Sequence, residues 1–242
     1  MSPSGAFGSR GLFVTGTDTG VGKTFVAALV AAVLRECGVR VGVYKPAASG
    51  CRREGEFLVA DDALALWEAA GRPGTLDRVC PQRFLAPLAP HLAARAEGRE
   101  LDDGLMRRGL DYWLAESEVV IVEGAGGLLS PLGDRLYVAD LALEFGFPLL
   151  VVAANRLGTI NHTLLTLHAA RGYGGGMAVA GVILNDVRPA ADDASLTSNG
   201  SELAARCGVP LLAQVSWQAA ALDGNVDWLA LCGPHRGFPS RP

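Results

Sequence analysis

Lysine is scarce in this chain of 242 residues, because only Lys23 and Lys45 are lysines among its 21 basic residues. Acidic residues outnumber basic ones, and the formal net charge of −4 leaves no global basic field that would attract nucleic acid or an anionic membrane. Long hydrophobic runs are also missing: they reach only about 8 residues, whereas a helix that spans a bilayer needs about 20. We therefore expect a soluble, cytoplasmic protein that acts on small molecules and binds neither nucleic acid nor a membrane.

Cysteine is present, but in a pattern that excludes a disulfide framework and a structural zinc site. The five cysteines are an odd, scattered set without a CxxC pair and without a histidine at metal-ligand spacing. We expect Cys37, Cys51, Cys80, Cys207 and Cys232 to be reduced thiols that mostly pack against apolar neighbours. Hydrophobic residues make up 50% of the chain and charged residues only 19%, which excludes intrinsic disorder.

Short apolar runs alternate with helical patterns along the whole chain. The predicted strands are 12–15, 39–44, 119–122, 149–153, 179–184 and 211–215, and the predicted helices are 23–36, 62–70, 103–115, 138–144, 160–171 and 200–207. The strands are nearly continuous in Val, Ile and Leu, which is typical of parallel strands buried on both faces. The chain is thus predicted to be one α/β domain over residues 1–242, a doubly wound, mostly parallel sheet with helices on both faces. Residues 1–10 and 233–242 are expected to be flexible tails.

A glycine-rich segment joins the first predicted strand to the first helix. Residues 16–24 read GTDTGVGKT, and their last three match the end of a phosphate-binding P-loop. In such a loop the backbone N–H groups surround phosphates, Lys23 reaches the terminal phosphates, and Thr24 binds magnesium. The usual spacing places glycine at position 17, where this chain has Thr17 and carries Gly16 one place earlier. The alternative is a glycine-rich turn with a surface lysine, but the position between a buried strand and a helix favours a fold of the P-loop NTPase type.

Charged residues follow two further strands at the same predicted edge of the sheet. Glu123 ends the third strand and precedes glycines, the arrangement in which a Walker-B carboxylate helps to hold the metal. A tight turn after a strand is the other interpretation. Lys45 follows the second strand, either as a site cation or as a solvated lysine. Asp62 is either a helix-start acid or a second magnesium ligand.

Polar residues also follow the fourth and fifth strands. The loop from Asn155 to His162 opens a helix whose free backbone N–H groups at 159–161 could bind a carboxylate, although a simple helix cap is the alternative. Asn185 and Asp186 end the fifth strand, where an amide could read a base edge or merely form a turn. His162 and His168 are a poor metal pair, and we expect both to be structural.

Six of these segments, in this order, resemble the dethiobiotin synthetase family, whose members are ATP-dependent carboxylases of biotin biosynthesis. They are residues 16–24, 44–46, 62–66, 122–127, 157–162 and 185–186. The resemblance implies a reaction in which an amine of 7,8-diaminononanoate captures CO2 as a carbamate, and ATP phosphorylates the carbamate. The second amine then closes the cyclic urea with loss of phosphate. The cofactors implied are ATP and Mg2+, and the implied assembly is a homodimer with the site at the interface.

The resemblance also implies a role for individual residues. Lys23 and Lys45 would be catalytic, because they would stabilise charge on the phosphates and the carbamate. The nucleotide would be bound by Gly20, Val21, Gly22, Lys23, Thr24, Phe25, Asp62, Glu123, Gly124, Ala125, Gly126, Asn185 and Asp186. Magnesium would be held by Thr24, Asp62 and Glu123. The diamine or its carbamate would contact Thr19, Ser49 and Lys45, and its carboxylate would bind across the interface at the loop that holds Gly158, Thr159 and Asn161.

The chain departs from the family pattern in two places that bear on the site. Ser216-Trp217 stands where the family often has Pro-Trp near the adenine, and residues 192–201 show no clear match, so no substrate residue is assigned there. Two other functions share this fold. A partition or septum-site type of nucleotide-switch ATPase would carry a signature lysine where this chain has Asp18. An amidoligase-like synthetase that acts on another carboxylate or amine would lack the pairing of segments 44–46 and 157–162.

Overall fold

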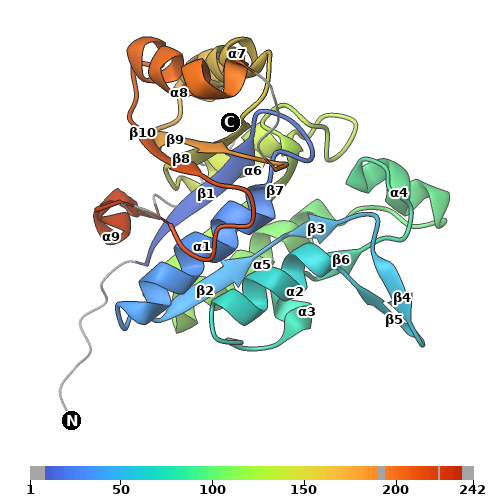
Figure 1. Ribbon diagram of the computed structural model, residues 1–242. Coiled ribbons are helices and arrows are strands. Elements are labelled where there is room, and N and C mark those ends of the chain that lie inside the picture. Colours follow the sequence, from blue (N-terminus) through green and yellow to red (C-terminus); the bar gives the residue numbers. More distant parts are fainter. Residues whose placement is uncertain (1–8, 190–193, 223, 236–242) are drawn as a thin grey trace.

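Six parallel strands form the central sheet of the computed structural model, which describes residues 9–189, 194–222 and 224–235. They are β1 (Arg10–Gly16), β2 (Val41–Tyr44), β7 (Val119–Gly127), β8 (Leu149–Ala154), β9 (Val179–Asn185) and β10 (Leu211–Val215). Their order is β10-β9-β8-β1-β7-β2, and each neighbouring pair is parallel (Figure 1). Strands β1, β2, β7 and β8 are almost wholly buried, which confirms the expected sheet with both faces covered.

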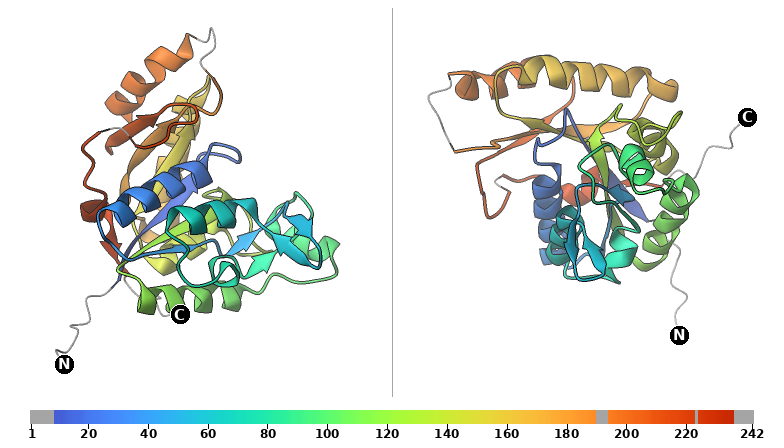
Figure 2. Two further views of the ribbon diagram at one scale, coloured as in Figure 1. Left: turned by 60° about the horizontal axis from the view of Figure 1, so that its bottom comes forward. Right: turned by 90° about the vertical axis from the view of Figure 1, so that its right-hand side faces the viewer.

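Helices cover both faces of this sheet. The longer ones are α1 (Lys23–Glu36), α2 (Asp61–Ala69), α5 (Asp103–Glu116), α6 (Val138–Phe145), α7 (Thr159–Gly172) and α8 (Ser195–Arg206). Figure 2 shows α1 and α5 on opposite sides of the strands. The sequence predicted α1 with the bounds that the structure has, whereas α8 begins at Ser195 and not at residue 200. Its first turns are rich in Ser, Thr and Asn and carry almost no apolar periodicity, so the sequence pattern placed its start too late.

The segment between β2 and α5 contains short elements that the sequence patterns did not predict. They are β3 (Ala47–Ala48), β4 (Arg52–Glu54), β5 (Phe57–Val59), α3 (Leu76–Val79), β6 (Gln82–Arg83) and α4 (Pro90–Ala96). Strands β4 and β5 form an antiparallel hairpin, and β3 pairs with β6 in parallel. Strand β4 is charged and exposed along its length, so it lacks the hydrophobic alternation that predicts a strand. The hairpin lies between the loop that holds Ser49 and the start of α2, and it therefore connects two parts of the site described below (Figure 1).

The two ends of the described chain pair with each other, contrary to the flexible tails that the sequence predicted there. Strand β11 (Gly233–Pro234) runs antiparallel to β1, and the N–H of His235 donates to the carbonyl of Ser9 at 3.1 Å. Strand β8 pairs with β1 only from Phe13 onward, so β11 takes the place of β8 beside Arg10 and Gly11. Residues 1–8 and 236–242 of the predicted tails lie outside the described residues.

The cysteines are free thiols, as predicted, and four of the five are buried while Cys37 is exposed. In the ranges of the chain that the structure describes, no helix has both the length and the apolar character needed to span a bilayer.

Candidate active site

A cleft of about 480 Å3 opens at the carboxyl ends of β1, β2 and β7, where ligands bind in doubly wound sheets. Its lining residues are Thr19, Gly20, Gly22, Lys23, Thr24, Phe25, Lys45, Ala47, Ala48, Ser49, Asp62, Glu123, Ala125 and Gly126. All of these except Ala47 and Ala48 were candidate site residues in the sequence. Four separate segments, three of which follow or end the parallel strands β1, β2 and β7 at one edge of the sheet, therefore meet in a single cleft.

The floor of the cleft is a cluster of charged and hydroxyl side chains around Glu123, which is 1% exposed. Its Oε1 accepts a hydrogen bond from Lys45 Nζ at 2.7 Å and another from Thr24 Oγ1 at 2.9 Å. Lys45 Nζ also lies 3.3 Å from Asp62 Oδ2 and 3.4 Å from the carbonyl oxygen of Gly124. The buried lysine is thus held between two carboxylates, and Glu123 Oε2 stays buried without a hydrogen-bond partner among the described residues.

The protonation states of this cluster follow from its geometry. Burial alone would lower the pKa of Lys45, but the negative charges of Glu123 and Asp62 and the hydrogen bond to Glu123 outweigh it and raise that pKa above its usual value. Burial would raise the pKa of Asp62, but the positive charge of Lys45 and its hydrogen bond keep that pKa below its usual value. Lys45 is therefore cationic and Asp62 anionic at neutral pH, which places a fixed positive charge in the cleft.

Lys23 begins α1, and its ammonium turns back onto its own loop. Nζ donates to the carbonyl oxygen of Asp18 at 3.2 Å, and the residue is 8% exposed. Burial lowers the pKa of Lys23, while the charge of Glu123 acts in the opposite direction. Gly22 precedes it with φ of 89°, and a Cβ at this position would lie 2.1 Å from Asn185 Nδ2. Glycine is needed here both for the left-handed backbone and for the close approach of β9.

A smaller cavity of about 310 Å3 adjoins the P-loop beside the end of β9. It is lined by Gly20, Gly22, Phe25, Asn185, Asp186, Val187, Trp217 and Gln218. Asn185 is 2% exposed; its Nδ2 donates to the carbonyl oxygen of Val21 at 2.9 Å, and its Oδ1 is buried without a partner among the described residues. The structure thus places the predicted residues Asn185 and Asp186 here, joins Asn185 to Val21 of the phosphate loop by a hydrogen bond, and brings Trp217 to the same cavity.

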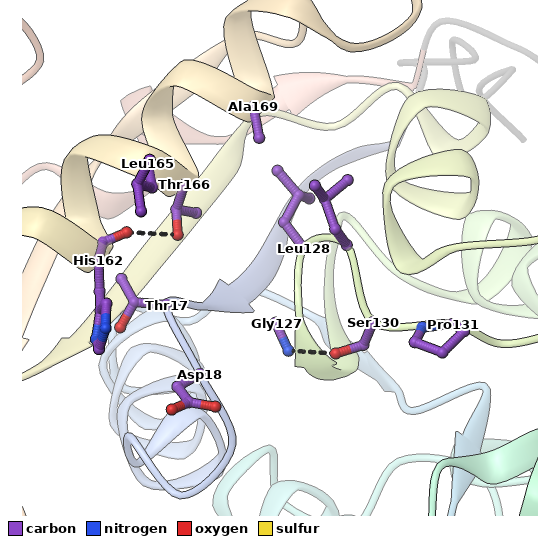
Figure 3. A pocket seen from close by; sticks show the side chains of 11 residues that line it. Thr17, Asp18, Gly127, Leu128, Ser130, Pro131, His162, Leu165, Thr166 and Ala169 are labelled. Atoms are coloured by element: carbon purple, nitrogen blue, oxygen red, sulfur yellow. Dashed lines mark hydrogen bonds between the residues drawn. The ribbon is translucent and has the colours of Figure 1, made fainter.

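The predicted residues at the start of α7 do not reach the 480 Å3 cleft, because no described residue from 157–161 lines it. Gly158 and Asn161 are exposed, whereas Thr159 is 2% exposed and its Oγ1 has no partner among the described residues. Helix α7 instead borders another cavity, of about 420 Å3, together with the loop after β7 (Figure 3). His162, Leu165, Thr166 and Ala169 line one side of this cavity, which we call the α7 cavity, and Gly127–Pro131 line the other. Sequence reasoning assigned no ligand-facing role to His162.

Comparison with known proteins fits this geometry. A family model described as an AAA domain matches residues 10–222. A curated protein from Rhodopirellula baltica named ATP-dependent dethiobiotin synthetase BioD is 46% identical over 215 residues, which cover 84% of this chain and 82% of that protein. A protein of the same name from Bacillus licheniformis is 41% identical, with 84% of each chain covered. The chain belongs to the dethiobiotin synthetase family.

Membership of the dethiobiotin synthetase family confirms the resemblance that the six sequence segments predicted. The solved structure of a ParA family ATPase from Chlorobium tepidum matches 87% of this chain and 85% of that chain, with a TM-score of 0.54 and 16% identity. At this identity the likeness concerns the fold alone, and it confirms the predicted P-loop type of α/β fold.

The residues predicted to hold magnesium have the chemistry that such a site in this family requires. Magnesium prefers oxygen ligands, and it is usually bound by one or two carboxylates together with substrate phosphates. Thr24, Asp62 and Glu123 offer a hydroxyl and two carboxylates around one point of the cleft, and the unpartnered Glu123 Oε2 is a ready ligand. The described residues include no cluster of three His, Cys, Asp or Glu that would form an all-protein metal centre.

Sequence reasoning did not predict a second set of polar residues, which lies outside the 480 Å3 cleft. Asp18 Oδ1 accepts a hydrogen bond from the N–H of Thr19 at 2.7 Å, and Asp18 Oδ2 lies 3.6 Å from Arg156 Nη2. Asn155 and Asn199 are buried and bonded to each other. Asn155 stands directly after β8 and Asp18 stands two residues after β1, which was a usable signal, whereas nothing in the local sequence marks Asn199.

Proposed function

We propose that this chain catalyses the ATP- and magnesium-dependent conversion of 7,8-diaminononanoate and CO2 to dethiobiotin, with release of ADP and phosphate. The observation that carries the proposal is the pair Lys23 and Lys45, which both line the P-loop cleft and are the only lysines in the sequence. The relatives are named ATP-dependent dethiobiotin synthetases, which supports ATP as the nucleotide and dethiobiotin as the product. Phosphoryl transfer depends mainly on positioning and electrostatics, which is what a cleft of fixed cations provides.

The chemistry requires charge stabilisation in three successive steps. One amine of the diamine attacks CO2 and loses a proton, which gives a carbamate. A carbamate oxygen then attacks the terminal phosphorus of ATP, which releases ADP and leaves a carbamic-phosphoric anhydride. The second amine attacks the carbonyl carbon and loses a proton, phosphate departs, and the cyclic urea is complete. Negative charge lies on the carbamate, the phosphates and the leaving group throughout, so the chain needs cations and hydrogen-bond donors and no nucleophile of its own.

Lys45 is suited to the carbamate and Lys23 to the phosphates. Lys45 is kept cationic by Glu123 and Asp62, and it lines the cleft beside Ser49 and Thr19, whose hydroxyls are placed to contact the diamine or its carbamate. Lys23 gives up its hydrogen bond to the carbonyl of Asp18 when a phosphate offers a better acceptor. When magnesium is bound by Thr24, Asp62 and Glu123, it supplies further neutralisation of phosphate charge.

Base recognition falls to the cavity at the end of β9. Within the described part of the chain the buried Asn185 Oδ1 lacks a donor, and the exocyclic amine of adenine would provide one, in the same way that asparagine recognises adenine elsewhere. Trp217 lies in the same cavity and offers a flat apolar face for the base. These two observations favour ATP over a nucleotide whose base presents a carbonyl at that position.

The substrate carboxylate is proposed to bind at the start of α7, in the cleft of a second copy. Gly158 is the N-cap and has no side-chain cap, and the N–H of Thr159 donates to the carbonyl of Arg156, so the N–H groups of Ile160 and Asn161 and the exposed side-chain amide of Asn161 are the donors offered to an anion. No residue of 157–161 lines the cleft of its own chain within the described structure, which supports a role for this loop in the cleft of another copy. The exposed apolar side chains of Leu157 (82%), Leu165 (58%) and Leu129 (51%) lie near it and offer a surface that a homodimer would cover.

The direct test incubates the purified chain with diaminononanoate, bicarbonate, ATP and magnesium, and detects dethiobiotin by mass. We expect product that depends on each component, and none from a Lys23→Ala variant. Steady ATP hydrolysis without dethiobiotin, stimulated by a protein partner, would overturn the proposal in favour of a nucleotide switch.

A further inference from the structure

A buried polar network joins the base cavity to the start of α7. Asn155 Nδ2 donates to Asp186 Oδ1 at 2.7 Å and to the carbonyl oxygen of Leu196 at 3.3 Å. Asn199 Nδ2 donates to Asn155 Oδ1 at 2.8 Å. The side chains come from three elements, the ends of β8 and β9 and the middle of α8. Asn155 is 1% exposed and Asn199 is 3% exposed, so neither amide is solvated, and Asn155 Oδ1 is satisfied by Asn199 Nδ2.

The same Asn199 amide also supports the backbone that opens α7. Its Nδ2 lies 3.3 Å from the carbonyl oxygen of Arg156, which it donates to. That carbonyl also accepts the N–H of Thr159 at 3.1 Å, the hydrogen bond that closes the turn before α7. Gly158, inside this turn, has φ of 93° and adds no side-chain contact that would fix it. Asn199 is thus a buried side-chain donor on the carbonyl that sets the direction of the first N–H groups of α7.

A second anchor holds the same turn from the other side. The Arg156 guanidinium lies 3.6 Å from Asp18 Oδ2 in the phosphate loop, but both side chains are about half exposed, at 45% and 54%. An exposed pair of this kind is weak and is screened by salt, whereas the hydrogen bond to the Arg156 carbonyl is partly buried and comes from a donor residue that is 3% exposed. Asn199 is therefore the stronger of the two supports for the turn.

We propose that Asn199 is a positioning residue for substrate binding, which acts through the Arg156 carbonyl to hold the first turn of α7 in the orientation that receives the diamine's carboxylate. This inference rests on the proposed function, in which residues 157–161 bind that carboxylate. Asn199 touches neither the nucleotide nor the diamine. Its effect is on the KM for the diamine, because a small change in the direction of the N–H groups weakens their hydrogen bonds to a carboxylate.

The test compares three variants in steady-state assays of dethiobiotin formation. Asn199→Leu keeps the volume of the side chain and removes its donor, and we expect a rise in the diamine KM of about tenfold with the ATP KM and kcat within about twofold. Gln82→Leu is the matched control: Gln82 is also a buried amide (4% exposed), but its hydrogen bonds go to the backbone of Asp102, away from α7. Both variants lower Tm by a few degrees, and only Asn199→Leu raises the diamine KM.

Asn161→Ala separates failure of this inference from failure of the proposed function. If Asn161→Ala raises the diamine KM and Asn199→Leu does not, the positioning role of Asn199 is wrong, but the assignment of residues 157–161 to the diamine's carboxylate is supported. If neither variant changes the diamine KM, the assignment of residues 157–161 to the diamine's carboxylate is wrong, and the positioning role of Asn199 is wrong as well. A diamine KM that rises equally in Gln82→Leu and Asn199→Leu shows loss of general stability and also overturns the positioning role.

Discussion

The cleft around Glu123 and the α7 cavity differ in nearly every physical property. The cleft is lined by charged groups that are buried and paired within one chain, with Lys45 Nζ 2.7 Å from Glu123 Oε1. The α7 cavity is bordered by the exposed Leu129 and by Leu165 of helix α7 (Figure 3), and the first turn of this helix has no side-chain cap. A buried ion pair is stable only when it is complete, so the cleft must be assembled when the chain folds. The exposed apolar side chains leave the α7 cavity open to completion by another copy.

This difference separates two kinds of site residue. Residues of the cleft act within their own chain, and their effects should not depend on protein concentration. Residues at the start of α7 and around the α7 cavity act between chains in our proposal, so their effects should depend on protein concentration. The predictions that follow test the separation, beginning with the largest effect.

Replacing Lys45 by methionine should reduce kcat by at least about 10²-fold, because it removes one preorganised charge-stabilising group, and nucleotide affinity should stay within a few-fold. The same change leaves Glu123 buried without its cation, which costs about 3–5 kcal/mol of folding free energy. Single-turnover kinetics and nucleotide titration measure the first effect, and thermal unfolding measures the second. The double variant Lys45→Met/Glu123→Gln should recover stability but not turnover. Weakened ATP binding with unchanged turnover would contradict the assigned role.

Replacing Lys23 by alanine should weaken nucleotide binding and turnover together, each by about tenfold or more, because its ammonium contacts phosphate in the ground state as well as in the transition state. Equilibrium titration with a non-hydrolysable ATP analogue, beside the steady-state assay, checks both quantities. Lys23 makes one hydrogen bond to its own loop, so its removal disturbs the fold less than removal of Lys45. A Lys23→Ala enzyme as active as the original would contradict the assignment of residues 16–24 as a phosphate-binding P-loop.

Replacing Leu165 by glutamate should shift the chain toward monomers and raise the diamine KM several-fold, with the affinity for ATP unchanged. Leu165 is 58% exposed on α7, so the charge costs little in a single chain but opposes the apolar contact with a second one. Sedimentation measures the assembly, and the diamine KM should fall again as protein concentration rises. His168→Glu, at another exposed position of α7 that does not line the α7 cavity, is the control. A monomer with the original diamine KM would place the whole site within one chain.

The sequence predicted the parallel sheet and the residues of the cleft for a common reason. Buried parallel strands are continuous in Val, Ile and Leu, and the polar residues of the site follow these apolar runs directly, as Lys45 follows β2 and Glu123 follows the run 119–122. The structure extends β7 beyond Glu123 to Gly127. For these residues, the local sequence pattern is enough to predict their position in the folded chain. Helix α1 is another such case, because its start at Lys23 is fixed by the glycines before it and its end by Gly38.

The parts that escaped prediction depend on contacts distant in sequence. Strand β11 exists because β8 leaves the first residues of β1 without a neighbour on that side. The hairpin β4–β5 is charged and exposed, so its pairing leaves no hydrophobic pattern. Asn199 is 44 residues from Asn155 and becomes significant only when α8 packs against the end of β8. No periodicity within a short window contains that information.

Mixed assembly of two inactive variants tests the central claim most directly. Chains carrying Lys45→Met retain the α7 loop, and chains carrying Asn161→Ala retain the cleft, so each kind is impaired by itself at low diamine concentration. When the two are co-expressed and purified together, the account predicts dethiobiotin formation well above that of either parent, because mixed dimers contain one site with both an intact cleft and an intact loop. Activity equal to the average of the two parents would show that each chain completes its own site and would contradict the account.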